Sequence, residues 1–269
     1  MRIGSRDFAT TGHTYIMGIL NVTPDSFSDG GKFNQIDAAL KHAEEMIGDG
    51  ADVIDIGGES TRPGYTKISD EEEIDRVVPV IEAVKKEFEI PISVDTYKSR
   101  VAEAAAQAGA DLINDIWGLK YDSHMAEVIA KSGLACCLMH NRDNTEYRNF
   151  MEDVKQDLRE TIVLAKAAKI ADDKIILDPG VGFAKSYENN LEVIRRLKEF
   201  NELKYPVLLG TSRKSVIGLT LDLPAAERVE GTIVTTVMAV EAGCMFVRVH
   251  DVKENHRAIQ MAEAILDRK

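Results

Sequence analysis

The feature that most constrains the fold is a unit that recurs eight times along the 269 residues. Each unit is an apolar run of strand length, a polar residue at its end, and an amphipathic helix. Because the runs are apolar almost throughout, we expect strands buried on both faces, as in a parallel sheet. Eight right-handed βαβ units predict an α/β protein with a (β/α)8 TIM barrel, in which residues 1–269 form a single domain. A doubly wound open sheet is the alternative.

The predicted strands end in acids, amides and imidazoles. In a barrel all the C-terminal strand ends lie at one face, and that face carries the chemistry. A single polar end could be a helix cap, but polar groups at nearly every end are hard to explain in that way. The residues at these ends are Asn21, Asp55, Asp95, Asn114 with Asp115, His140, Asp178, Gly210 and His250.

The stretch Gly-Thr-Ser-Arg-Lys-Ser at 210–215 follows one of these strands and precedes a helix. Such a turn leaves backbone N–H groups aimed at one point, with the positive end of the helix dipole behind them. Lys214 adds a mobile charge and Ser215 a hydroxyl, so the stretch predicts an anion-binding site. The alternative is an ordinary serine N-cap beside a solvated lysine.

Arg248 gives the strongest argument for function from physical chemistry alone. It lies two residues before His250 on the last predicted strand, so both side chains point to the same face. An arginine that points into a barrel is costly unless an anion meets its charge. Two long connections, 21–34 and 57–69, could fold over this end of the barrel as lids.

Composition narrows the partners. The net charge of −12 argues against nonspecific binding to nucleic acid. No signal peptide is expected at the polar start, and no apolar run approaches the roughly 18 residues of a membrane span, so we expect no membrane partner. Cys136, Cys137 and Cys244 lie in apolar runs and are expected to be buried thiols of a cytoplasmic protein. Residues 1–14 are expected to form an extended lead-in, with a hairpin turn near Thr11 and Gly12.

Two long and six short segments resemble, in order, the signatures of the dihydropteroate synthase family. The resemblance extends over nearly the whole chain. It departs from the family pattern after His140, where Gly and Pro are missing, and at Tyr65, where a small residue is common. The segments are Ile16–Gly31, Gly50–Pro63, Ser93–Thr96, Asn114–Asp115, Leu138–His140, Leu177–Phe183, Gly210–Ser215 and Arg248–Asp251.

This resemblance implies a transferase that joins 6-hydroxymethyl-7,8-dihydropterin diphosphate to 4-aminobenzoate. The products would be 7,8-dihydropteroate and diphosphate, formed on the folate route with Mg²⁺ assisting. The family is commonly homodimeric, which implies an interface on the outer helices late in the chain.

The resemblance also implies which residues hold the pterin. A carboxylate can accept two parallel N–H donors from the flat pterin edge, and an amide can both donate and accept. The implied pterin-binding residues are Asp95, Asn114, Ile116, Met139, Asp178, Phe183, Gly210 and Lys214.

The other ligands are implied to bind beside the pterin. Asn21 is the implied contact of Mg²⁺, and Asp55 is expected to help orient this group. The implied diphosphate-binding residues are Asn21, Thr61, Arg62, Arg248 and His250. The implied aminobenzoate-binding residues are Thr61, Arg62, Pro63, Phe183, Lys214 and Ser215.

The substrate itself suggests the mechanism. Diphosphate can leave an electron-rich allylic centre before the amine attacks, so we expect a dissociative step with Asp95, Asp178, Lys214 and Arg248 as the catalytic residues. Two alternatives stay open. One is a pterin-binding barrel that transfers a methyl group from a folate, and the other is a non-catalytic relative that binds a pterin.

Overall fold

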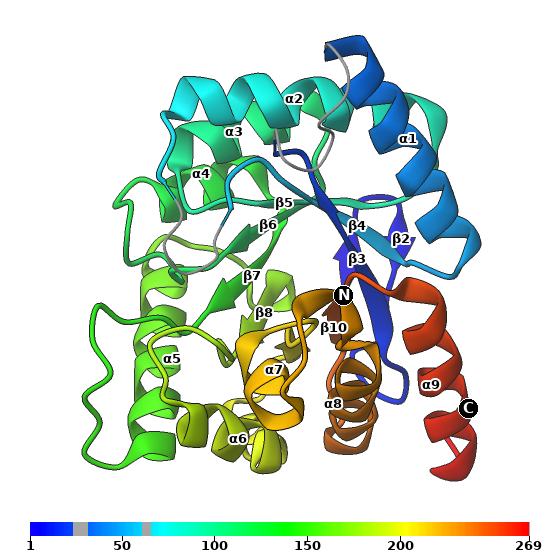
Figure 1. Cartoon of the computed structure of the whole chain (residues 1–269). Coiled ribbons are helices and arrows are strands. Elements are labelled where there is room, and N and C mark those ends of the chain that lie inside the picture. The colour runs from blue at the N-terminus through cyan, green and yellow to red at the C-terminus, as the bar shows by residue number, and fades with distance from the viewer. Residues whose placement is uncertain (24–31, 61–65, 269) are drawn as a thin grey trace.

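The structure is a computed structural model that describes residues 1–23, 32–60 and 66–268, and in it helices surround a ring of strands (Figure 1). The parallel strands pair in the order β8-β7-β6-β5-β4-β3-β10-β9, and a bridge between Leu177 and Val207 joins the two ends of this order. The prediction of a (β/α)8 barrel is therefore confirmed. The strands are β3 Tyr15–Asn21, β4 Val53–Gly57, β5 Ile92–Asp95, β6 Leu112–Asp115, β7 Ala135–Met139, β8 Ile175–Asp178, β9 Leu208–Leu209 and β10 Phe246–Val249.

The helices around the barrel repeat the apolar spacing seen in the sequence, because one face of each must pack on the strands. None of those in the described ranges is long and apolar enough to cross a membrane. That residues 1–269 form a single domain stays a prediction. The helices are α1 Lys32–Gly48, α2 Asp70–Glu87, α3 Ser99–Ala108, α4 Met125–Ser132, α5 Phe150–Ala167, α6 Tyr187–Arg195, α7 Ser215–Leu221, α8 Val229–Ala242 and α9 Val252–Ile265.

An N-terminal hairpin packs against the barrel interior. Its strands, β1 Arg2–Ile3 and β2 Arg6–Asp7, are antiparallel, and Ile3 belongs to the apolar cluster that fills the barrel interior. The turn is formed at Gly4, which has a φ of 56°, so the expected turn near Thr11 and Gly12 is wrong. A Cβ at Gly4 would lie 2.6 Å from Asp111 Oδ1, which shows how closely the hairpin approaches the strands.

Residues along each strand alternate between the barrel interior and the helices, and this alternation decides which side chains reach the rim. Met17, Val53, Leu112 and Phe246 pack inside the barrel. The residues two or four positions further along these strands share the inward direction. The register of the neighbouring strands identifies their inward residues in the same way. The inward residues near the C-terminal ends are Asn21, Asp55, Asp95, Asn114, Met139, Asp178, Gly210 and Arg248.

Asp55 lies deeper than the sequence indicated. We expected Asp55 to lie at the end of its strand, but β4 continues to Gly57 and pairs Asp55 with Ser93 of β5. The side chain of Asp55 is fully buried inside the barrel. It is therefore placed to organise the residues at the rim from below.

Candidate active site

Three predicted catalytic residues meet beside Gly210 at the C-terminal rim. The point where a Cβ of Gly210 would lie is 3.6 Å from Asp178 Oδ2 and 3.9 Å from both Arg248 Cβ and Lys214 Nζ. These side chains come from β8, from the loop after β9 and from β10. The missing side chain of Gly210 thus leaves space where a carboxylate, an ammonium group and a guanidinium group converge.

Two carboxylates of the chain itself meet the charge of Arg248. Its Nε donates to Asp55 Oδ2 at 2.6 Å, and its Nη2 donates to Asp95 Oδ2 at 2.7 Å. Asp55 also accepts hydrogen bonds from Ser93 Oγ and, at 3.4 Å, from Asn114 Nδ2. Burial acts to lower the pKa of Arg248, but Asp55 and Asp95 raise it above its ordinary value. Asp55 was expected only to help orient the site. In the structure it connects Arg248 of β10 to Ser93 of β5 and Asn114 of β6.

Asp95 is the incomplete member of this group. Its Oδ1 is buried and, among the residues that the structure describes, is the one buried side-chain N or O atom without a hydrogen-bond partner. Burial raises the pKa of this carboxyl to about 7, against the opposing effect of Arg248. An unpaired buried carboxylate oxygen costs free energy, and this favours a site in which a ligand supplies the missing donor.

Asp178 and Lys214 lie on either side of the space at Gly210. Asp178 Oδ1 accepts a hydrogen bond from the backbone N–H of Gly180 at 2.7 Å, and burial raises the pKa of this carboxyl. Lys214 Nζ donates to the carbonyl of Val181 at 2.5 Å. Burial lowers the pKa of Lys214 to about 8, so the group is mostly an ammonium at neutral pH but gives up its proton more readily than an ordinary lysine. Both groups can exchange hydrogen bonds with a ligand that excludes water from them.

An apolar cluster stands apart from the two that form the barrel core. Ile116 and Met139 belong to it with Tyr97, and Trp117 and Phe183 pack against it. Lys214 Nζ lies 4.7 Å from the centroid of the Phe183 ring, which connects this cluster to the charged groups. The structure thus brings together the three apolar residues that the sequence analysis assigned to a pterin.

The predicted anion loop has partners of its own. Ser212 Oγ lies 3.0 Å from His250 Nδ1, and Arg213 Nε donates to Asp251 Oδ2 at 3.0 Å. These contacts fix the loop against the end of β10. Ser215 is exposed and is the first residue of the seven-residue α7.

Asn21 reaches the same rim from β3. A Cβ at Gly57 would lie 3.7 Å from Asn21 Oδ1 and 3.8 Å from Asp95 Oδ2. Within residues 1–23, 32–60 and 66–268, no group of three His, Cys, Asp or Glu side chains is placed to hold a metal ion. The predicted site residues Thr61, Arg62 and Pro63 lie outside the described residues.

Comparison with known proteins defines the class. A model of the family described as pterin binding enzyme matches residues 17–250, so the barrel is that of a pterin-binding enzyme. A dihydropteroate synthase of Clostridium beijerinckii is 62% identical over 269 residues, which are 100% of both chains. The chain belongs to the dihydropteroate synthase family and is a transferase of folate biosynthesis.

Solved structures agree with this assignment. A dihydropteroate synthase from Clostridium difficile, crystallised in the presence of pteroic acid, is 52% identical with a TM-score of 0.93 and covers 100% of both chains. A dihydropteroate synthase from Xanthomonas albilineans with 4-aminobenzoic acid is 40% identical with a TM-score of 0.90. It covers 94% of this chain and 93% of that chain.

Proposed function

We propose that the rim around Gly210 binds 6-hydroxymethyl-7,8-dihydropterin diphosphate and joins it to 4-aminobenzoate. The observation that carries this assignment is the meeting of Asp178 Oδ2, Lys214 Nζ and Arg248 at one point, where Arg248 also binds Asp95, whose Oδ1 is unpaired among the described residues. Each of these groups complements one part of the substrate.

The flat pterin ring would lie over Gly210. Asp178 Oδ2 would accept N–H donors from the ring edge, since its Oδ1 is already bound to Gly180. Asn114 would donate and accept at the neighbouring edge, and Lys214 would donate to the ring oxygen. Asp95 Oδ1 would accept a further ring N–H. The apolar wall of the ring site would be Ile116, Met139 and Phe183.

In the reaction the bond between C9 and the diphosphate oxygen breaks first, and the electron pair leaves with the diphosphate. Arg248 and His250 would donate hydrogen bonds to the departing oxygens, while Asp95 and Asp178 stabilise the positive charge left on the ring. The neutral aromatic amine then attacks C9 and loses a proton. A secondary isotope effect close to unity at C9 would contradict this dissociative order.

Asn21 fits Mg²⁺, because an amide oxygen is a hard donor and this ion keeps several waters and phosphate oxygens in its coordination sphere. Mg²⁺ bound there would neutralise charge on the diphosphate. Thr61 and Arg62 are proposed to contact the diphosphate as well.

The second substrate would bind at the outer side of the pterin. Ser215, Phe183 and Lys214 are the described residues proposed for the aminobenzoate. Thr61, Arg62 and Pro63 would join them from the loop after β4.

One assay separates this function from its alternatives. Purified protein is given the dihydropterin diphosphate, and diphosphate release is followed with and without 4-aminobenzoate and Mg²⁺. We expect release that requires both. Neither a folate methyltransferase nor a non-catalytic pterin-binding protein would show diphosphate release that depends on 4-aminobenzoate.

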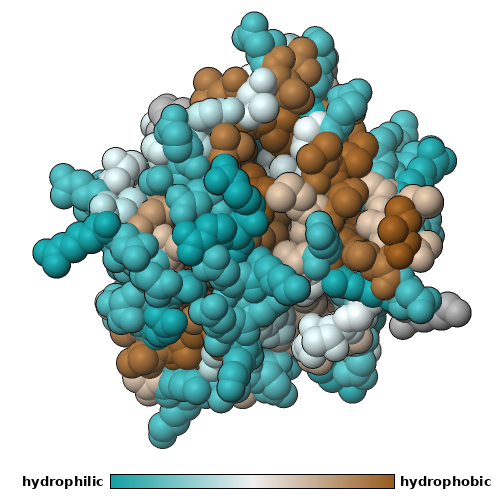
Figure 2. Space-filling view, turned by 90° about the horizontal axis from the view of Figure 1, so that it is seen from below, coloured by the Kyte–Doolittle hydropathy of each residue, from teal (hydrophilic) through white to brown (hydrophobic). Residues whose placement is uncertain are grey.

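We also propose that the protein forms a homodimer in the cytoplasm. The free cysteines Cys136, Cys137 and Cys244 are buried, which supports a reducing compartment. Large apolar side chains are exposed on neighbouring helices late in the chain, and Figure 2 shows hydrophobic residues gathered along one side of the molecule seen from below. Light scattering should give twice the mass of one chain, and a monomer at micromolar concentration would contradict this. The exposed residues are Leu219 and Leu221 of α7, Val234 and Val237 of α8, and Met261 and Ile265 of α9.

A further inference from the structure

The loop between β8 and α6 is held by side-chain donors that bind its carbonyl groups. Lys185 Nζ donates to the carbonyl of Gly180 at 2.9 Å and to that of Phe183 at 3.1 Å. Lys214 and Tyr147 bind two further carbonyls of the same loop. This loop begins at Asp178 and carries the Phe183 ring, so its shape sets two walls of the candidate pterin site. The sequence analysis assigned no role to Lys185.

The third hydrogen of the Lys185 ammonium group points at His140. Lys185 Nζ lies 2.8 Å from His140 Nδ1, and His140 Nε2 lies 2.9 Å from Asp157 Oδ2. The Asp157 carboxylate can only accept, so Nε2 carries the hydrogen and Nδ1 offers its lone pair to Lys185. Three acceptors therefore match the three N–H groups of a charged lysine.

The electrostatics of this group agree with that tautomer. Burial lowers the pKa of His140 to about 4, which keeps the ring neutral. Burial acts to raise the pKa of Asp157, but His140 and Arg142 lower it well below its ordinary value. Burial also lowers the pKa of Lys185 to about 7, while the negative charges of Asp178 and Asp157 act in the opposite direction by favouring the ammonium form.

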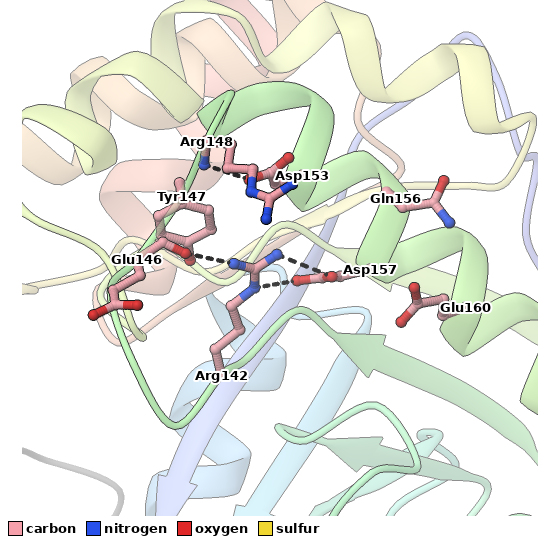
Figure 3. A pocket seen from close by; sticks show the side chains of 8 residues that line it. All are labelled: Arg142, Glu146, Tyr147, Arg148, Asp153, Gln156, Asp157 and Glu160. Atoms are coloured by element: carbon pink, nitrogen blue, oxygen red, sulfur yellow. Dashed lines mark hydrogen bonds and ion pairs between the residues drawn. The ribbon is translucent and has the colours of Figure 1, made fainter.

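The same network reaches the outer surface of the protein. Arg142 Nε donates to Asp157 Oδ2 at 2.5 Å, and Arg142 Nη1 donates to the carbonyl of Glu146 at 2.8 Å. These residues line a pocket of about 580 Å³ between α5 and the loop that precedes it (Figure 3). Asp157 thus joins a surface ion pair to the buried His140 and, through it, to Lys185.

The turn that Lys185 holds controls the orientation of Asp178. Gly180 has a φ of 71°, and a Cβ there would lie 2.0 Å from the carbonyl oxygen of His140, so only glycine fits. In this conformation the Gly180 N–H binds Asp178 Oδ1, and Oδ2 is left facing Gly210.

We propose that Lys185 is a positioning residue for the pterin. It fixes the turn at Gly180 and the carbonyl of Phe183, so that Asp178 Oδ2 and the Phe183 ring face the ligand before it binds. This role rests on the proposed function, because it assumes that a pterin is read by Asp178. It reaches the ligand through Asp178 and Phe183 and makes no contact with the reacting atoms.

The test is a double-mutant cycle on pterin affinity. Lys185→Met keeps the length of the side chain but removes its charge and donors, and Asp178→Asn removes the carboxylate that Lys185 positions. The dissociation constant of 6-hydroxymethylpterin is measured by calorimetry for both single variants, the double variant and the wild type. Lys185→Met should weaken binding about tenfold. In the Asp178→Asn background it should weaken binding only about threefold, because one of the two groups that Lys185 positions is already gone and only the effect through Phe183 remains.

Lys198→Met is the matched control, since Lys198 is exposed on the segment after α6. It should bind the pterin as the wild type does. Steady-state kinetics give a second reading, in which Lys185→Met should raise KM for the dihydropterin diphosphate more than it lowers kcat. A residue that merely supports the fold would lower the melting temperature without this split. Should Lys185→Met not fold, Lys185→Gln, which keeps donors but no charge, is measured in its place.

Two outcomes would overturn the inference. One is a Lys185→Met variant that binds the pterin within twofold of the wild type. The other is a cycle in which the losses of the two single variants multiply in the double variant. If the wild type binds the pterin but makes no dihydropteroate, the proposed function fails while the binding cycle still decides the role of Lys185.

Discussion

Two buried groups in this barrel have the same arrangement of charge, a cation between two carboxylates. At the rim, Arg248 donates to Asp55 at 2.6 Å and to Asp95 at 2.7 Å. Beside the start of α2, Lys98 donates to Glu59 at 2.8 Å and to Glu73 at 2.7 Å. Since the ion pairs are alike, the difference between the two groups must lie in what else surrounds them.

The group around Lys98 satisfies its own hydrogen bonds. Glu59 accepts from Tyr97 OH at 2.5 Å and from the backbone N–H of Ile68 at 2.9 Å, and Lys98 also donates to the carbonyl of Ile68 at 2.9 Å. Burial acts to raise the pKa of Glu59, but Lys98 and Tyr97 lower it below its ordinary value. This group is complete, and it ties Glu59 to Ile68 at the two ends of the loop after β4.

In the group around Arg248, by contrast, one carboxylate oxygen lacks a hydrogen-bond partner within the described part of the chain. Asp95 Oδ1 has no partner among the described residues, and burial raises the pKa of Asp95 to about 7. A buried ion pair is therefore no sign of a functional site by itself. The distinguishing sign is a buried acceptor that has no hydrogen-bond partner in the described ranges. Variants of the two groups should therefore differ in whether they affect ligand binding or stability.

The largest effect is expected at the rim. Arg248→Met removes the guanidinium that we propose to face the departing diphosphate, and kcat/KM should fall roughly 1000-fold, as when a preorganised donor to a developing anion is lost. The assay is diphosphate release at saturating 4-aminobenzoate. Arg195→Met, an exposed arginine on α6, serves as the control and should retain full activity. Activity of Arg248→Met within tenfold of the wild type would remove Arg248 from the mechanism.

The next largest effect is expected on stability. Lys98→Met leaves Glu59 and Glu73 buried without their cation, and the free energy of unfolding should fall by about 3 kcal/mol. Urea denaturation gives this value, while the affinity for 6-hydroxymethylpterin should stay within about twofold. The exposed Lys131→Met should leave the midpoint of unfolding nearly unchanged. The assignment of the two groups would be reversed if Lys98→Met had normal stability but no longer bound the pterin.

Two glycines allow the same comparison without a change of charge. At Gly210 an added Cβ makes only ordinary contacts, the nearest at 3.6 Å, so Gly210→Ala should fold normally. The added methyl group would occupy ligand space and should weaken pterin binding roughly 30-fold, about 2 kcal/mol. At Gly58 an added Cβ would lie 2.8 Å from Val77 Cγ1 beside Glu73, so Gly58→Ala should lower stability by about 2 kcal/mol and spare binding. Equal effects of both variants on both quantities would argue against a ligand at Gly210.

The sequence predicted the barrel because its signal is periodic and local. Apolar runs, helical spacing and order along the chain decide a (β/α)8 fold, and the polar strand ends pointed to one face. The prediction failed where a position depends on a neighbour that is distant in sequence. The length of β4 beyond Asp55 follows from pairing with β5, and the hairpin turn at Gly4 follows from its approach to Asp111. Neither neighbour is visible in a local pattern.

The site was predicted unevenly for the same reason. That Asp178, Lys214 and Arg248 lie at one rim could be predicted because a strand end or a buried cation stands out in the sequence. The argument that Arg248 needs an anion did not foresee that Asp55 and Asp95 of the chain itself meet its charge. Lys185 was missed, since a lysine in a loop has no distinctive pattern until its three acceptors are seen.

The smallest effect should appear in the titration of Asp95. Its pKa in the free protein is raised from 3.8 to about 7, so the stability linked to this proton is complete below pH 3.8 and is lost as the pH rises through about 7. The Asp95→Asn variant should lack this loss of stability. The difference between the curves of stability against pH for the wild type and the variant therefore isolates the contribution of Asp95. A pterin that donates an N–H to Oδ1 favours the ionised carboxylate and should lower the pKa of Asp95 by about one unit. Carbon-13 NMR of labelled aspartate, with and without 6-hydroxymethylpterin, measures this shift. A pKa that rises or stays constant on binding would mean that the open oxygen does not meet the ligand, and the contrast with the group around Lys98 would then need another cause.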